Sequence, residues 1–425
     1  MSAFDKVIGY DSIKTELLQV CDVIHNPEVY SAMGARLPRG ILLSGEPGLG
    51  KTLLAKAFIE ESGLQAYMVR RDTAEGDFIS DIAAKFGAAK EHAPAIVFLD
   101  DMDKFANEDD RHPDAAEYVA VQAGIDVVRD SEVYVIATVN DEDKLPESLI
   151  RPGRFDRYIH VETPCEKDAE EIIKHYLSGK KLAEDVDLED VSRMIRYSSC
   201  AELETILNEA AILAAYARKP VLDMSDIVKA VLRMTYKASD DLNSVSDAER
   251  AERAIHEAGH LVVSEVLIPG SVGMASIQCS RGGSAGGFIH MCTGPESVEQ
   301  AVMIGLGGKC ASEMINAAGA ASGCTSDLRK AVRVIRDDML HNAGCGFALM
   351  NANGSRYEDL SGDLSAKVET AIHLELEKYA FRTRDILKRN EDFLCAVIEE
   401  LSKKETLLYS DIRAIREKCG IGETA

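Results

Sequence analysis

Gly45-Glu46-Pro47-Gly48-Leu49-Gly50-Lys51-Thr52 follows a short apolar run and precedes a segment with helical spacing that starts at Leu53. This is the phosphate-loop pattern in its strand, loop and helix setting. Glycines let backbone amides close around phosphates at the N-terminus of a helix, while Lys51 can reach the outer phosphates and the Thr52 hydroxyl can ligate magnesium. The stretch from Gly45 to Leu53 therefore predicts a site for a nucleoside triphosphate with Mg²⁺.

Short apolar runs alternate with helical patterns on both sides of this loop, which is the order of a parallel sheet flanked by crossover helices. Helical spacing is found, for example, in Leu53 to Glu61 and Asp77 to Lys90. The predicted strands are Gly40 to Ser44, Ala66 to Val69, Ala95 to Leu99, Val133 to Val139 and Tyr158 to Val161. The first half of the chain is thus expected to be an α/β nucleotide-binding core.

Polar residues follow two of the predicted strands. Asp100 and Asp101 come directly after Ala95 to Leu99, and Asn140 follows Val133 to Val139. A carboxylate at the carboxyl end of a strand next to the phosphate loop suits a magnesium shell, so Asp100 is predicted on the metal side. Asn140 is suited to orient a water near the terminal phosphate.

The segment from Lys167 to about Met234 lacks a strand pattern and contains amphipathic runs such as Cys200 to Tyr216, which predicts an all-helical subdomain. A polar stretch then has the composition of a linker. We predict a multidomain chain with an α/β core, a helical lid subdomain, a linker and a C-terminal domain, at residues 1–163, 164–238, 239–247 and 248–425.

A second motif, His256-Glu257-Ala258-Gly259-His260, lies on a predicted helix that Ser246 and Glu249 would cap. Two imidazoles at i and i+4 share one face of a helix, so both can ligate one Zn²⁺ while Glu257 deprotonates a water. Two β-prone runs, Ala275 to Cys279 and Gly287 to Cys292, could form a hairpin, and everything after Val298 is expected to be helical.

The bulk composition excludes several classes of protein. A net charge of −24 without a basic cluster argues against a nucleic-acid partner. Ten cysteines without a Cys-x-x-Cys pair indicate neither a disulfide framework nor a thiolate metal site, which favours the reducing cytoplasm. No stretch approaches the roughly 20 apolar residues that a membrane-spanning helix needs. Attachment to a membrane through a partner stays open.

Ile136-Ala-Thr-Val-Asn140 with Leu149-Ile-Arg151-Pro-Gly-Arg154-Phe-Asp-Arg157 resembles the AAA+ ATPases, in which arginines of one subunit reach the nucleotide of the next. The resemblance implies ATP as the nucleotide, a homo-hexameric ring, and Arg151 and Arg154 as the fingers. It also places Val7-Ile8-Gly9 at the adenine and Ser199 to Leu203 over it.

Ala254 to Val263, Leu306 to Ile315 and Thr325 to Leu328 resemble successive blocks of the FtsH-type ATP-dependent zinc metalloproteases, AAA+ enzymes that degrade polypeptides. The resemblance implies Asp327 as the third zinc ligand and Glu313 as an orienting acid. It covers about Phe4 to Glu417 but not the transmembrane part of most members, which leaves a soluble branch or a fragment as alternatives.

Three residues or segments depart from the family. Asp101 replaces the glutamate expected to polarise the attacking water, and a side chain one methylene shorter is expected to slow hydrolysis unless the backbone compensates. The pore segment is shortened around Ala74-Glu75-Gly76, and Cys200 replaces a glycine near the nucleotide. Besides an ATP-driven protease, two readings therefore stay open: a nucleotide-gated peptidase of unfolded substrates, and a non-proteolytic remodelling or scaffold protein.

Overall fold

The computed structural model describes residues 2–35, 38–71, 78–106, 116–151, 153–238, 246–278, 287–316, 324–341 and 362–421. The chain divides into two compact units, Met1–Gly179 with Tyr197–Leu207, and Lys180–Arg196 with Asn208–Ala425. The shortened pore segment and residues 239–245 of the predicted linker lie outside the described residues. The division into four domains stays a prediction, because the two units part within the predicted helical lid.

The first unit is built on a parallel sheet with the strand order β2-β3-β4-β1-β5. The strands are β1 (Gly40–Ser44), β2 (Gln65–Val69), β3 (Ala95–Leu99), β4 (Val133–Val139) and β5 (Arg157–His160). All five predicted strands are present within one residue at each end. The α/β class of this part of the chain is confirmed.

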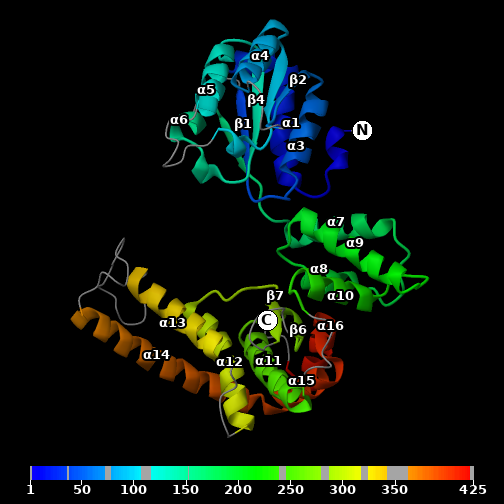
Figure 1. Ribbon diagram of the computed structural model, residues 1–425, viewed down its shortest axis with the longest axis vertical. Helices are drawn as coiled ribbons and strands as arrows, with labels where there is room; N and C mark the ends of the chain where they lie inside the picture. Colours follow the sequence, from blue (N-terminus) through cyan, green and yellow to red (C-terminus); the bar gives the residue numbers. More distant parts are fainter. Residues whose placement is uncertain are drawn as a thin grey trace. The chain divides into compact units, whose positions relative to one another are not determined.

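Helices cover both faces of this sheet (Figure 1). The first unit contains helices α1 (Asp11–His25), α2 (Pro27–Ala32), α3 (Lys51–Ser62), α4 (Phe78–Glu91), α5 (Ala116–Val128), α6 (Glu147–Ile150) and α7 (Glu166–Ser178), with 3-10 turns at Ala3–Lys6, Met102–Lys104 and Glu142–Lys144. Neighbouring residues of a strand point to opposite faces, so Leu42 packs with Phe86 of α4 and Leu43 packs with Phe58 of α3. The inner strands β1, β3 and β4 are mainly apolar because both of their faces are buried, whereas the edge strands β2 and β5 have exposed positions.

The second unit contains most of the predicted lid helices. These are α8 (Leu188–Met194), α9 (Cys200–Tyr216) and α10 (Met224–Met234). The first turns of α9, up to Leu207, belong to the first unit. The lid helix α8 is joined to the C-terminal part of the same unit, because the Ser410 hydroxyl donates to Asp190 at 2.6 Å and the Arg193 guanidinium lies 3.6 Å from the ring centroid of Tyr409.

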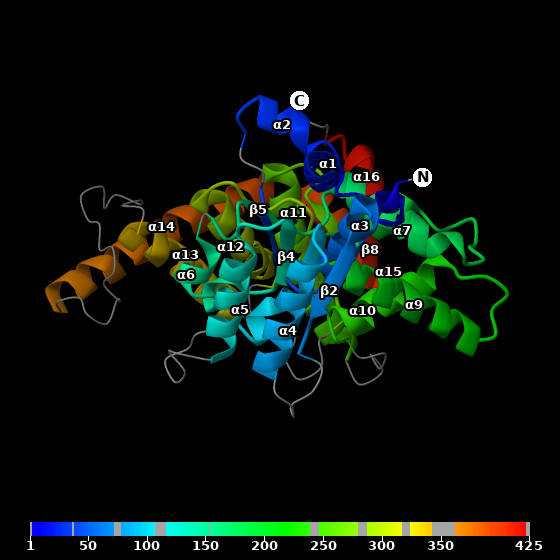
Figure 2. The same cartoon turned by 90° about the horizontal axis from the view of Figure 1, so that it is seen from above.

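The rest of the second unit is mainly helical, as predicted. It contains α11 (Asp247–Leu267), α12 (Val298–Ile315), α13 (Cys324–His341), α14 (Gly362–Arg389), α15 (Glu391–Lys404) and α16 (Tyr409–Lys418), with strands β6 (Val272–Ser276), β7 (Phe288–Met291) and β8 (Thr406–Leu408). The long helices α13 and α14 run side by side (Figures 1 and 2).

The predicted strand pair is present as the antiparallel pair β6 and β7, but β6 begins at Val272, three residues before the predicted run from Ala275 to Cys279. The expectation that everything after Val298 is helical was wrong at Thr406–Leu408, because β8 adds a third strand to β6 in the order β7-β6-β8. Three residues are too short to show an alternating pattern, so the pairing of Leu407 with Ala275 depends on the tertiary fold.

Candidate functional site

The helix α11 presents the second motif on its buried face. The helix begins at a capping box in which the Ser246 hydroxyl accepts from the Glu249 amide and the Glu249 carboxylate accepts from the Ser246 amide. His256 and His260 lie one turn apart and are 7% and 8% exposed. Their rings stand edge to face with centroids 4.7 Å apart. Both imidazoles therefore face the same small volume.

Asp327, on the first turn of α13, completes this group. Its Oδ2 lies 3.1 Å from Nε2 of His256 and 3.5 Å from Nε2 of His260, and the two Nε2 atoms are 3.1 Å apart. Among the described residues, these three offer one ligand atom each within 4.8 Å of one another. Two imidazole nitrogens and a carboxylate oxygen are the donor set of a catalytic Zn²⁺ that keeps one position open. The residues fit the ion.

Glycines of α12 make room for this group. A Cβ atom on Gly308 would lie 2.5 Å from Nε2 of His260 and 2.6 Å from the ring of His256. Next to it, Gly259 and Gly307 let the backbones of α11 and α12 approach, because a Cβ on Gly259 would meet the Gly307 carbonyl oxygen at 2.4 Å. Sequence reasoning did not single out Gly308, although it follows Gly307 in the second resembling block.

The Nδ1 atoms of His256 and His260 each have a neighbouring polar group. His260 Nδ1 lies 2.7 Å from the carbonyl oxygen of Ile304, and an Nδ1–H bond to a carbonyl leaves Nε2 free for a metal. His256 Nδ1 faces the thiol of Cys324 at 3.9 Å. Glu313, predicted to orient a ligand histidine, instead pairs with Lys309 and with Arg384, the latter at 3.2 Å.

Glu257 follows His256 on α11 and is 4% exposed. Burial raises the pKa of its carboxyl group, against the lowering effect of His260, His256 and the Gly287 amide. A carboxylate with a raised pKa is suited to accept a proton from water. The geometry thus keeps a candidate general base beside a candidate zinc site.

The phosphate loop lies between β1 and α3 in the first unit. Gly45, Gly48 and Gly50 have φ values of 140°, 82° and 87°, which side chains rarely adopt. Lys51 Nζ donates to the carbonyl oxygens of Gly45 and Glu46 at 2.5 and 2.6 Å, so its ammonium lies over the loop. The loop, from Glu46 through Pro47 to Thr52, is therefore shaped to surround a phosphate.

The predicted magnesium residues lie together at the carboxyl ends of β3 and β4. The hydroxyls of Thr52 and Thr138 donate to Asp100 Oδ1 at 2.8 and 2.9 Å. Asp101 has the left-handed φ of 54°, and its carboxylate accepts from Lys104 at 2.7 Å and from the Asn140 side chain at 3.3 Å. The oxygen donors fit Mg²⁺, and Asp101 and Asn140 share one edge of the site.

A cavity of about 120 Å³ next to the loop fits the predicted adenine site. Ile8, Leu49, Gly50 and Leu53 contribute to its walls, whereas Gly9 is not a lining residue. Gly9 instead has φ of 70°, and a Cβ there would meet Asp168 at 2.8 Å. The full lining comprises Lys6, Val7, Ile8, Tyr10, Leu49, Gly50, Leu53, Leu54, Ile172, His175, Tyr176 and Cys200.

Sequence reasoning missed one wall of this cavity. Ile172, His175 and Tyr176 of α7 stand at i, i+3 and i+4, a spacing that places them on one helical face. That periodicity could have identified them. The predicted lid turn reaches the loop, because the Ala201 amide donates to the Gly48 carbonyl oxygen at 3.1 Å, and the thiol of Cys200 lies 3.4 Å from the Tyr10 hydroxyl.

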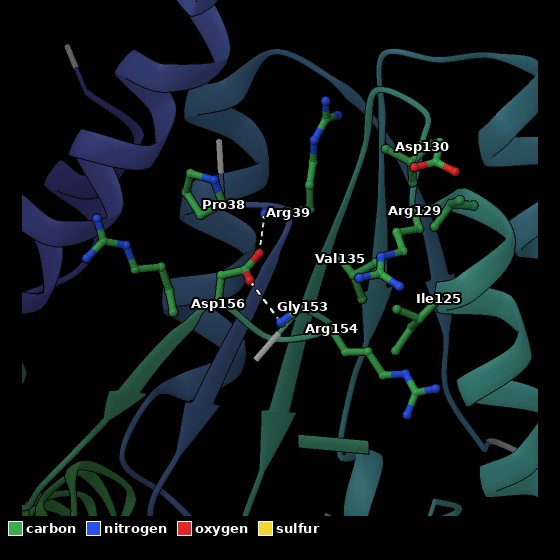
Figure 3. A pocket seen from close by; sticks show the side chains of 12 residues that line it. Pro38, Arg39, Ile125, Arg129, Asp130, Val135, Gly153, Arg154 and Asp156 are labelled. Atoms are coloured by element: carbon green, nitrogen blue, oxygen red, sulfur yellow. Dashed lines mark hydrogen bonds between the residues drawn. The ribbon is translucent and has the colours of Figure 1, made fainter. Parts of the chain in front are cut away.

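The two predicted finger arginines differ in their surroundings. Arg154 is 5% exposed, and its Nε and one terminal nitrogen donate to the Asp126 carboxylate at 3.2 and 2.8 Å. It also donates to the Ser148 carbonyl oxygen. Figure 3 shows Arg154 at the edge of a cavity of about 600 Å³. Arg151 is exposed.

Comparisons with known proteins match two segments of the chain to known families. Residues 41–163 match the ATPase family associated with various cellular activities (AAA), and residues 243–415 match peptidase family M41. The chain is 32% identical, over 97% of its length, to ATP-dependent zinc metalloprotease FtsH 2 of Symbiobacterium thermophilum, of which it covers 74%. The chain belongs to the FtsH family. Zinc and ATP are the cofactors of these ATP-dependent zinc metalloproteases.

Two other FtsH proteins show the same likeness. The FtsH of Leptotrichia buccalis is 33% identical over 97% of this chain, which spans 56% of that protein, and the FtsH of Caldicellulosiruptor bescii is 31% identical with 71% covered. Hence the chain spans between about half and three quarters of these FtsH proteins. In the part of the chain that the structure describes, no helix is both long and apolar enough to cross a membrane.

Proposed function

We propose that this FtsH family member hydrolyses polypeptides at the His256, His260 and Asp327 site and drives their delivery with ATP bound at the phosphate loop. One observation carries the proposal: donor atoms of three residues from two helices converge, with a buried carboxylate beside them. A scaffold without peptidase activity does not require this arrangement. The non-proteolytic reading is therefore disfavoured.

The peptidase residues have separate roles in this proposal. His256, His260 and Asp327 would hold Zn²⁺, which when bound polarises a water and the peptide carbonyl. Glu257 accepts the proton of the attacking water and can pass it to the leaving amine. The Ile304 carbonyl oxygen fixes the ring of His260, so that Nε2 stays directed at the ligand group.

The ATPase residues act on the phosphates. Lys51 and the loop amides bind the outer phosphates, while Thr52 and Asp100 would hold Mg²⁺. Asp101 and Asn140 are positioned to orient the attacking water. Arg151 is exposed and has the freedom to reach the nucleotide of a neighbouring subunit, which supports a homo-hexameric ring.

A second candidate is a nucleotide-gated peptidase that accepts only unfolded chains. The observation in its favour is Asp101, whose side chain is one methylene shorter than the family's glutamate and is held by Lys104 and Asn140. A short carboxylate at this position favours slow ATP hydrolysis and hence weak unfolding. For either candidate we propose the cytoplasm as the compartment, which is supported by the free thiols of the eight cysteines among the described residues.

One experiment separates these functions. Degradation of a stable folded substrate and of an unfolded one is measured with and without ATP, for the wild type, Glu257→Gln and Lys51→Ala. An ATP-driven protease degrades both substrates only with ATP, and Glu257→Gln abolishes both activities. Cleavage of the unfolded substrate that survives Lys51→Ala identifies the gated peptidase. No cleavage by a wild type that contains about one zinc per chain would contradict both.

A further inference from the structure

Tyr236, two residues after the end of α10, is bound to the edge strand β7. Its ring is stacked on Phe288 with centroids 3.7 Å apart and planes 10° apart. Its hydroxyl lies 2.7 Å from Nδ1 of His290. Burial lowers the pKa of His290 and raises the pKa of Tyr236, which favours the neutral form of both groups in this bond. One side chain thus makes two contacts with alternate residues of one strand.

The side chains on the two faces of β7 contact different parts of the second unit. Ile289 and Met291 pack against the core of the peptidase region, whereas Phe288 and His290 are the residues that Tyr236 contacts. Among the strands described, β7 pairs with β6 alone, because it is the edge of the order β7-β6-β8. An edge strand with one partner depends more on its side-chain contacts than a central strand does.

The residue that precedes β7 touches the candidate catalytic base. Gly287 packs against the Glu257 side chain, and its amide lowers the pKa of the Glu257 carboxyl group. A Cβ on Gly287 would lie 2.6 Å from Cγ of Glu257 and 2.0 Å from the Ser276 carbonyl oxygen, so the chain just before β7 leaves no room for a side chain next to the base. A small displacement of β7 therefore changes the position of the Glu257 carboxylate.

We infer that Tyr236 is a positioning residue of the peptidase site: its stack on Phe288 and its bond to His290 hold β7 where Gly287 packs against Glu257. The inference rests on the proposed peptidase function for its kinetic consequence. Its structural part, that Tyr236 fixes the start of β7, stands without that function. Tyr236 belongs to the predicted lid subdomain, so a lid residue acts here through a strand of the peptidase region.

The kinetic test uses the full-length chain and a short fluorogenic peptide. Tyr236→Ala is expected to lower kcat by about tenfold, since a misplaced base slows proton transfer, and to change KM by less than about twofold. Tyr236→Phe keeps the stack and is expected to retain kcat within about threefold of the wild type. Phe288→Leu, which removes the stack from the other side, should reproduce the loss if Tyr236→Ala fails to fold.

Zinc content and melting temperature are measured for every variant. Tyr216→Ala is the control, because Tyr216 ends α9 in the same predicted subdomain and is 86% exposed. An unchanged kcat in Tyr236→Ala overturns the inference. So does a loss of kcat that appears only together with loss of zinc or a collapse of the melting temperature.

Hydrogen exchange separates this inference from the proposed function. In Tyr236→Ala the amides of residues 287–291 should exchange at least about tenfold faster than in the wild type, with α15 unchanged as an internal reference. If the wild type cleaves no peptide, the proposed function fails, and the exchange rates alone decide whether Tyr236 holds β7. Unchanged exchange at residues 287–291 overturns the inference in either case.

Discussion

Oδ2 of Asp327 lies 3.1 Å from Nε2 of His256, although 71 residues separate the two in the sequence. The packing of α11, α12 and α13 brings them together, and neither motif contains the information by itself. A carboxylate at this distance from two imidazole nitrogens is what turns a pair of histidines into a site for a divalent ion.

Asp327→Ala should reduce zinc affinity at least about 100-fold, because it removes one of three protein ligands. Dialysis against a weak chelator followed by metal analysis measures this without any activity assay. The matched control is Asp337→Ala on the same helix, where the carboxylate is exposed and pairs with Arg333. Retention of zinc by Asp327→Ala would show that another residue supplies the third ligand.

Gly308→Ala should also abolish zinc binding. The added Cβ would lie 2.5 Å from Nε2 of His260, where the ion has to be, and the backbone of α12 cannot withdraw because it packs on α11. Gly305→Ala is the control on the same helix, since a Cβ there meets no atom within 4 Å. Equal zinc content in the two variants would refute the role assigned to Gly308.

Arg154→Ala should lower the free energy of unfolding of the first unit by about 2 kcal/mol, because it removes the buried guanidinium that donates hydrogen bonds to Asp126 and Ser148. Thermal unfolding measures the change. Arg151→Ala should leave the melting temperature unchanged and lower the ATPase rate by about 10³-fold, as expected for an exposed arginine that acts in trans. The reverse pattern would assign the finger to Arg154.

Asp101→Glu should raise the ATPase rate by about tenfold, because the added methylene extends the carboxylate toward the attacking water. The steady-state rate of phosphate release measures it at saturating ATP. Asp101→Asn is the companion variant and should lose activity, since an amide cannot polarise the water. If Asp101→Glu is slower than the wild type, the left-handed backbone at Asp101 already provides the required reach.

The amino-acid sequence by itself determined the elements and the local motifs. Apolar runs bounded by turns identified the five parallel strands, most clearly β1, β3 and β4, because strands buried on both faces are mainly apolar. The i and i+4 spacing of His256 and His260 fixed their shared helical face, since helix geometry is local. Asp327 was assigned through family resemblance, because spacing along the chain does not reveal it.

The tertiary structure decided what depends on contacts between distant segments. Three features join residues that are far apart in the sequence. They are the pairing of β8 with β6, the close approach of Gly308 to His260 and the contact of Tyr236 with β7. The burial of Arg154 against Asp126 also distinguished two arginines that look equivalent within one motif. Local sequence patterns encode backbone conformation, whereas the partners of a side chain are set by packing, which brings together segments that no local pattern connects.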